Sequence, residues 1–173
     1  AGAQHSQSVH SWVGNVPGWV VVTATTPYDA KGLFKSAIRD DNPVFFLPHK
    51  LLSEKRGEVP EEEYTLPLGE AEVEVSGDDV TVVATQLMFH RAKEAAANVD
   101  ADVEIINPRT FAPLDTETIA ESVRKTGRLV VVDETVERYG TQGHIANEIV
   151  ENNFFSLDAP PKTIGVKDIP VPL

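Results

Sequence analysis

The alternation of short β-branched runs with amphipathic segments is the sequence feature that most constrains the fold. Short apolar runs, most of them rich in Val and Ile, recur at residues 20–22, 44–47, 80–84, 103–106, 129–132 and 163–166. Between most of these runs, apolar residues follow the i, i+3, i+4 spacing of a helix face. Such alternation predicts an α/β protein with a mostly parallel sheet, right-handed crossovers and helices on both sheet faces.

Local signals place several of these elements. Thr26 can cap a helix that begins at Pro27, and Asp29 favours the positive end of its dipole. The helix is expected to stop at Asp40–Pro43. A short helix is also expected within residues 8–16. Residues 71–75 alternate Glu with apolar residues, and the turn-forming segment 76–79 follows them. We expect this strand to pair with 80–84 as an antiparallel hairpin.

The acidic residues are concentrated in the middle of the chain. The net charge is −12, and residues 54–104 contribute −10 of it from four basic and fourteen acidic residues. This balance argues against a nucleic-acid partner, which needs clustered Lys and Arg. A solvated face or linker explains most acidic segments; adaptation to high salt and docking of a basic partner are the alternatives. Residues 51–66, with Gly57, Pro60 and Glu61–Glu63, are expected to link residues 1–50 to a self-sufficient domain at 67–173.

Several classes of function are excluded by what the sequence lacks. The chain has no cysteine, which excludes disulfides, thiolate metal sites and cysteine nucleophiles and favours a cytoplasmic location. No apolar run is long enough to span a membrane, and the first residues do not match a signal peptide. No P-loop or G-x-G-x-x-G motif is present. The five histidines have no zinc-site spacing. Gly140–Gly143 opens a helix, which favours a tight turn over an anion site.

Taken together, a set of short motifs resembles one enzyme family over nearly the whole chain. The motifs are Gln4–Ser8, Trp12, Pro17–Gly18, Thr26–Leu33, Ser36–Val44, Gly57–Pro60, Pro67–Gly69, Pro113–Asp115, Gly127–Val132, Leu157–Pro160 and Pro170–Pro172. The chain resembles the beta subunit of thiamine-diphosphate-dependent 2-oxo acid dehydrogenases of the pyruvate, branched-chain and acetoin types, relatives of transketolase. The resemblance implies the second half of a pyrimidine-binding domain at 1–50. It also implies a transketolase C-terminal-like, three-layer α/β/α domain at 67–173.

The resemblance also implies a function. An intact relative decarboxylates a 2-oxo acid on thiamine diphosphate with Mg²⁺ and acylates a lipoyl group. Its partners are an alpha subunit, a second beta subunit and the lipoyl acyltransferase core. The family's cofactor-activating glutamate lies upstream of Ala1, a terminal helix usually follows the region of Leu173, and the G-D-G motif of the alpha partner is absent here. The chain is therefore expected to be a fragment cut at both ends and inactive alone.

Four residues are candidates for functional sites through the resemblance. His5 matches a histidine that faces the active site, near substrate and lipoyl group; a frayed terminal residue is the alternative. Ala37, Asp40 and Asn42 match a potassium site built from carbonyl oxygens at a helix C-terminus and an asparagine side chain. An ordinary helix stop by Asn42–Pro43 is the alternative there.

Two other hypotheses about the function of the whole chain remain open. It can be a non-catalytic assembly module derived from the same subunit, or the matching region of a transketolase or deoxyxylulose phosphate synthase. If the chain stands alone, a homo-oligomer is expected, because cutting a two-domain subunit leaves apolar surface uncovered. Phe45, Phe46, Phe154 and Phe155 are the candidate contacts.

Overall fold

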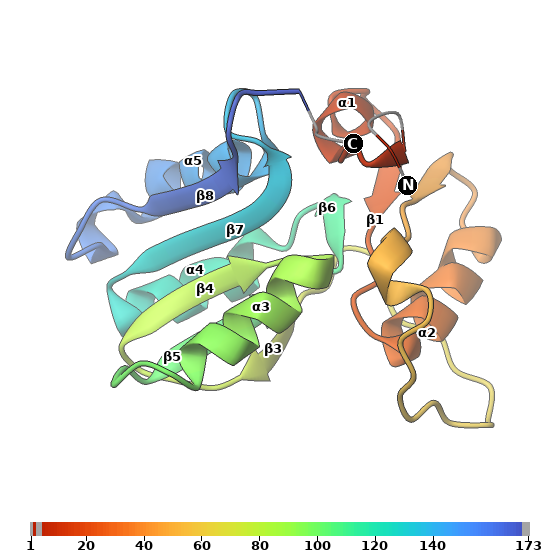
Figure 1. Cartoon of the computed structure of the whole chain (residues 1–173), viewed down its shortest axis with the longest axis horizontal. Coiled ribbons are helices and arrows are strands. Elements are labelled where there is room, and N and C mark those ends of the chain that lie inside the picture. Colours follow the sequence, from red (N-terminus) through yellow and green to blue (C-terminus); the bar gives the residue numbers. More distant parts are fainter. Residues whose placement is uncertain (1, 3–4, 171–173) are drawn as a thin grey trace.

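The computed structural model describes residues 2 and 5–170 as two sheets with helices packed on them (Figure 1). The helices are α1 (His10–Gly14), α2 (Pro27–Arg39), α3 (Gln86–Ala96), α4 (Thr116–Thr126) and α5 (Thr141–Asn153), with the 3₁₀ turns η2 (Lys50–Leu52) and η3 (Phe154–Ser156). The strands are β1 (Val20–Val22), β2 (Val44–Phe46), β3 (Glu72–Val75), β4 (Val80–Ala84), β5 (Val103–Asn107), β6 (Thr110–Ala112), β7 (Leu129–Val136) and β8 (Lys162–Val166). In the part of the chain described, no helix is long and apolar enough to cross a membrane.

The larger sheet has five strands in the order β3-β5-β4-β7-β8, and all pairs except β3–β5 are parallel. Figure 1 shows α3 on one face, with α4 and α5 on the other. Adjacent residues of β5 belong to the cores on opposite faces of the sheet. Ile105 packs in one cluster with Phe89 of α3. Ile106 packs in another with Ile119 of α4 and Ile145 of α5. The predicted three-layer α/β/α architecture with a mostly parallel sheet is confirmed.

The predicted hairpin between 71–75 and 80–84 is wrong. β3 pairs antiparallel with β5, which lies between β3 and β4. The turn segment crosses the start of β5 instead of closing on itself, since the amide of Asp79 donates to the carbonyl of Asp102 at 2.8 Å. Gly77 permits this crossing because a Cβ there would lie 2.4 Å from the carbonyl carbon of Val103. The buried strand β5 thereby gains a hydrogen-bonding neighbour on each edge.

The smaller sheet has three strands in the order β2-β1-β6 and joins the N-terminal part of the chain to residues 110–112. β1 pairs parallel with β2 and antiparallel with β6, although β6 comes from the C-terminal part of the sequence. β6 was not predicted, because it holds only three residues between Pro108 and Pro113. Val21 of β1 belongs to the same buried cluster as Val83 and Val131 of the larger sheet. The two sheets therefore share one core.

Helix α2 begins as the sequence predicts and is covered by the segment that follows η2. Thr26 and Asp29 form a capping box, with the amide of Asp29 donating to Thr26 Oγ1 at 3.0 Å. The predicted linker packs along the length of this helix, from Tyr28 to Arg39. Glu63 pairs with Lys35 at 2.7 Å and with Arg39 at 2.6 Å, and these hydrogen bonds and charges lower the pKa of Glu63 to about 2. The ring of Tyr64 stacks on that of Tyr28 at 4.6 Å.

We expect Gly32→Ala to destabilise the chain by about 1 kcal/mol, because the added methyl overpacks the contact between α2 and this segment. A Cβ at Gly32 would lie 2.6 Å from Leu66 Cγ and 2.8 Å from Tyr64 Cε2. The overpacking costs about 2 kcal/mol, and the gain of about 1 kcal/mol in helix propensity offsets about half of it. Urea unfolding measures the difference. Gly143→Ala on α5 is the matched control, because nothing lies within 4 Å of a Cβ there; equal or greater stability of Gly32→Ala than of the parent would contradict the packing.

Candidate functional site

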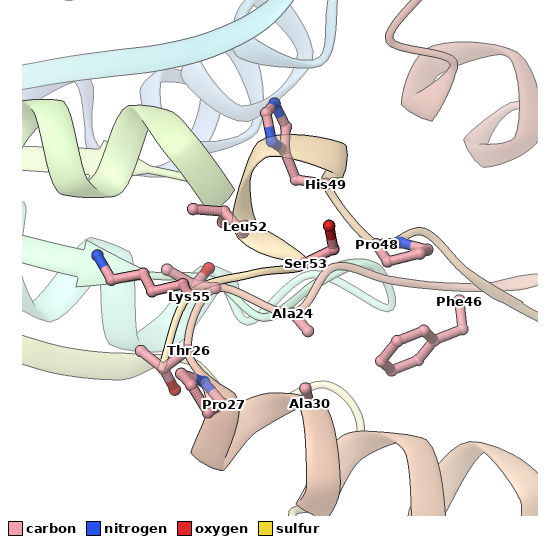
Figure 2. Close-up of a pocket in the computed structure, with 11 residues that line it drawn as sticks. Ala24, Thr26, Pro27, Ala30, Phe46, Pro48, His49, Leu52, Ser53 and Lys55 are labelled. Carbon is pink, nitrogen blue, oxygen red and sulfur yellow. The ribbon is translucent and has the colours of Figure 1, made fainter. Parts of the chain in front are cut away.

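A pocket of about 280 Å³ opens where β1 and β2 end and α2 begins (Figure 2). Ligand sites in α/β proteins commonly lie at the carboxyl ends of parallel strands. The lining residues come from the β1–α2 junction, the end of β2 and the loop around η2: Ala24, Thr25, Thr26, Pro27, Ala30, Phe46, Pro48, His49, Leu52, Ser53 and Lys55. Figure 2 shows Phe46 at one end of this lining, the apolar end, and Lys55 at the other, the cationic end, with the Lys55 ammonium directed away from Phe46.

Two histidines with defined hydrogen bonds hold the loop that forms one wall. His49 Nδ1 accepts from the amide of Leu51 at 3.2 Å, so Nε2 carries the proton and donates to Glu134 Oε2 at 2.7 Å. His90 Nε2 faces the carbonyl oxygen of Thr25 at 3.1 Å, which leaves Nδ1 to accept from Lys55 Nζ at 2.9 Å. These bonds fix η2 to β7 and the cationic end of the pocket to α3.

A wider pocket of about 500 Å³ lies beside the first and shares Thr26, Pro27 and Lys55 with it. Charged side chains of both signs line it, including those of Arg109 and Glu74. Burial is the main effect that raises the pKa of Glu74, and the negative charge of Asp29 adds to it. This second pocket is therefore a mixed electrostatic surface, whereas the first has apolar walls.

Beneath both pockets, a buried polar network joins α2 to the larger sheet. Asp29 Oδ1 accepts from Arg109 Nε at 3.0 Å, and its Oδ2 accepts from Asn107 Nδ2 at 3.0 Å. Thr25 Oγ1 in turn donates to Asn107 Oδ1 at 3.0 Å and accepts from the amide of Gln86 at 3.2 Å. Gln86 and Arg109 adopt φ angles of 47° and 58°, a strained conformation for residues with a Cβ. The network fixes the position of the β1–α2 junction.

A second buried network surrounds Asp133, near the middle of β7. Its Oδ1 accepts from Thr85 Oγ1 at 2.8 Å, its Oδ2 accepts from Thr135 and Thr141, and His10 Nδ1 lies 3.5 Å from Oδ2. Burial acts to raise the pKa of Asp133, but the nearby imidazole of His10 and the two hydroxyls outweigh it. The pKa therefore lies well below its usual range. The network anchors α1 to the larger sheet.

The residues predicted from the resemblance do not line either pocket. His5 is exposed near the start of the chain, and its amide donates to the carbonyl of Gly2 at 3.0 Å. Ala37, Asp40 and Asn42 lie at the opposite end of α2 from the pockets, about 20 Å along the helix axis for its 13 residues. The backbone amide and Nδ2 of Asn42 both donate to Asp40 Oδ1 at 2.8 Å. The carbonyl of Ala37 is among the last four of the helix, which lack an intrahelical partner.

Sequence reasoning missed the pockets and both buried networks. The first pocket is lined by Ala, Pro, Leu and Phe together with Thr, Ser, His and Lys from separate segments, and the motif Thr26–Leu33, which supplies part of this lining, does not by itself indicate a pocket. The spacing of His10 and His90 in the sequence indicates no site, yet His10 is buried against Asp133 and His90 is half-buried against Thr25. One signal was present: Asp133 directly follows the run Leu129–Val132, and alternation places it on the buried face of β7.

Comparison with known families assigns both parts of the chain. Residues 69–173 match the family described as transketolase, C-terminal domain, and residues 1–55 match the transketolase pyrimidine binding domain. The split-gene transketolase described as an inactive beta4 tetramer superposes with a TM-score of 0.80 over 97% of this chain and 55% of that one. At 24% sequence identity, this likeness supports the fold.

Curated relatives match almost the full chain. The beta subunit of acetoin:2,6-dichlorophenolindophenol oxidoreductase from Bacillus subtilis is 42% identical over 175 residues, covering 99% of this chain and 51% of the relative. The pyruvate dehydrogenase E1 component subunit beta of Rhizobium meliloti is 44% identical, covering 98% and 38%. The 2-oxoisovalerate dehydrogenase subunit beta of Bacillus subtilis is 42% identical, covering 96% and 52%. The chain thus spans about half the length of the two Bacillus subtilis relatives and a smaller share of the Rhizobium meliloti one. It belongs to the transketolase C-terminal domain family, with part of a transketolase pyrimidine binding domain ahead of that domain.

Proposed function

We propose that the chain is part of the beta subunit of a thiamine-diphosphate-dependent 2-oxo acid dehydrogenase, an enzyme that decarboxylates a 2-oxo acid and passes the acyl group to a lipoyl arm. The observation that supports this most is the identity of 42–44% over nearly the whole chain with beta subunits named for acetoin, pyruvate and 2-oxoisovalerate. These three names differ in substrate at similar identity, so the proposal stops at the 2-oxo acid class and its acetoin branch.

The proposal includes partners that complete the cofactor site. Residues 2 and 5–170 contain no group of three His, Asp or Glu side chains that could hold a metal ion. We assign Mg²⁺-bound diphosphate to an alpha-type partner, because the family carries the G-D-G motif in that subunit and this sequence has none. A second beta subunit, a lipoyl acyltransferase core and a cytoplasmic location complete the proposal. Homo-oligomerisation of the chain alone stays a prediction.

Within this chain, His5 is the proposed catalytic residue. Its imidazole is exposed. The side chain is therefore accessible to a substrate bound on a partner subunit. An imidazole can donate a hydrogen bond to a carboxylate or transfer a proton near neutral pH. Potassium is proposed at Ala37, Asp40 and Asn42, where helix-end carbonyls carry partial negative charge. The ordered contact between Asp40 and Asn42 supports a fixed loop at that point.

The test is an activity assay on the natural gene product that carries these residues, purified with its alpha-type partner. Reduction of 2,6-dichlorophenolindophenol is followed with acetoin, pyruvate and 2-oxoisovalerate in the presence of thiamine diphosphate and Mg²⁺. We expect turnover of at least one substrate, and a kcat lower by about 100-fold or more for His5→Ala, the usual scale for loss of an acid–base group. His144→Ala, exposed on α5, is the control. Absence of turnover with all three would contradict the proposal and favour the non-catalytic assembly module.

A further inference from the structure

His10 is the first buried side chain that follows the proposed catalytic residue His5 in the sequence. The side chains at 5–7 are exposed and those at 8 and 9 are half-buried, whereas His10 is only 5% exposed. Helix α1, which His10 begins, has five residues and no side-chain cap. Helices this short are not stable in water without tertiary contacts. The position of α1, and of the segment ahead of it, therefore depends on the buried contacts of the helix.

The buried contacts of His10 are one aromatic ring and one carboxylate. Its ring centroid lies 5.0 Å from that of Phe111 on β6, and its Nδ1 lies 3.5 Å from Asp133 Oδ2 on β7. Within the described part of the chain, His10 Nδ1 is buried without a hydrogen bond of normal geometry. Burying a polar nitrogen costs free energy unless a polar group compensates it. Asp133 is the group placed to do so.

Asp133 is a fixed point in the larger sheet. Its side chain is 1% exposed, and hydroxyl groups from three places in the fold donate to it. Thr85, directly after β4, donates to Oδ1 at 2.8 Å. Thr135 of β7 and Thr141 of α5 donate to Oδ2. The contact with His10 therefore joins a short N-terminal helix to a carboxylate that three other bonds already hold in place.

We infer that His10 is a positioning residue, which holds α1 on Asp133 and thereby fixes the segment that presents His5. This inference rests on the proposed function, in which His5 meets a substrate bound on a partner subunit. His10 itself is buried, so it acts through His5 and not by contact with the substrate. Without the anchor, His5 would remain exposed but would not stay at one position. A misplacement of about 1 Å can lower a rate by about 100-fold.

Amide hydrogen exchange on the 173-residue chain tests the anchor without any turnover. His10→Phe keeps a ring beside Phe111 but removes the nitrogen that faces Asp133. We expect exchange in residues 5–14 to become at least about tenfold faster and exchange in α4 to stay within about twofold, because only a local unit opens. His10→Asn places an amide nitrogen where Nδ1 lies and should exchange like the parent. Unchanged exchange in His10→Phe, or an equal increase in α4, would overturn the inference.

A double-mutant cycle in the natural gene product with its alpha-type partner tests the link to His5. We expect His10→Phe to lower kcat at least about tenfold and to leave the KM for the 2-oxo acid within about twofold, with most of the kcat restored in His10→Asn. In the His5→Ala background, the same change should cost less than about twofold, because residues that act together are not additive. His144→Ala, exposed on α5, is the control.

The two measurements separate this inference from the function on which it rests. An equal loss of kcat in both backgrounds would show a structural role only and would overturn the inference. No turnover in the parent would contradict the proposed function instead, and the exchange rates would then decide by themselves whether His10 anchors the segment.

Discussion

Replacing Asp29 with alanine is expected to lower the free energy of unfolding by about 3–5 kcal/mol, the scale for removing one partner of a buried ion pair. The side chain of Asp29 is 1% exposed and accepts from Arg109 Nε and Asn107 Nδ2, while its Oδ2 also accepts from the amide of Thr26. Among the described residues, alanine would leave the buried guanidinium of Arg109 with only the half-exposed Glu72 as a charge partner, at 3.0 Å. Two further donors would lose their acceptor.

Urea unfolding at fixed ionic strength measures this effect, with the m-value as a check that the same surface is exposed. Asp29→Asn keeps the shape and the acceptor for Thr26, so an intermediate loss is expected. Asp41→Ala, on the exposed loop after α2, is the control and should change stability by less than about 0.5 kcal/mol. A loss below about 1 kcal/mol for Asp29→Ala would contradict the role of this network in joining α2 to the larger sheet.

Asp133→Asn is expected to cost about 2–3 kcal/mol at pH 7, because an amide nitrogen would face hydroxyls that now donate to a buried carboxylate. The side chain of Asp133 is 1% exposed, and it accepts from Thr85, Thr135 and Thr141. The substitution also removes an acid dependence. The folded-state pKa is depressed, so the stabilisation is fully present above the unfolded value of about 3.9 and is lost as pH falls toward the folded value.

The measurement is the free energy of unfolding between pH 7 and pH 2 for both proteins. The parent should lose stability more steeply than Asp133→Asn below about pH 4. Glu63, whose pKa is lowered to about 2, titrates in both proteins, so the difference between the curves reports on Asp133. Parallel acid limbs would mean that the buried carboxylate carries no such linkage. Asp41→Asn should reproduce the parent curve.

The elements of the fold that the sequence predicts are those that depend on local residue patterns. The start of α2 is predicted by Thr26, Pro27 and Asp29, and the β-branched runs predict the central strands. The order of strands depends instead on long-range contacts. Gly77 turns the chain across the start of β5, so two neighbouring strands in sequence do not pair in space. β6 owes its pairing to β1, and no signal within its three residues reveals this.

The candidate sites likewise divide into those predicted from local motifs and those that depend on long-range contacts. His5 and the potassium residues were predicted from short motifs that resemble a family, and these functional predictions await the assays above. The pocket at the β1–α2 junction joins residues from the segment after β1, the start of α2, the end of β2 and the loop around η2. Its cationic end depends on His90, which lies 35 positions from Lys55 in the sequence. Such a site becomes visible only when the chain is folded, because its parts are ordinary residues in separate elements.

The most direct test of the proposed division of labour is a calorimetric titration of the 173-residue chain with thiamine diphosphate and Mg²⁺. Thiamine chemistry needs a carboxylate at the pyrimidine ring and a metal-bound diphosphate, because the protein's contribution is to position the cofactor. The proposal assigns the diphosphate site to the partner subunit and leaves His5 to this chain. It predicts no saturable heat for the chain alone, and no carbon dioxide from pyruvate or 2-oxoisovalerate. A micromolar dissociation constant would contradict the account, because the chain would then hold the cofactor by itself.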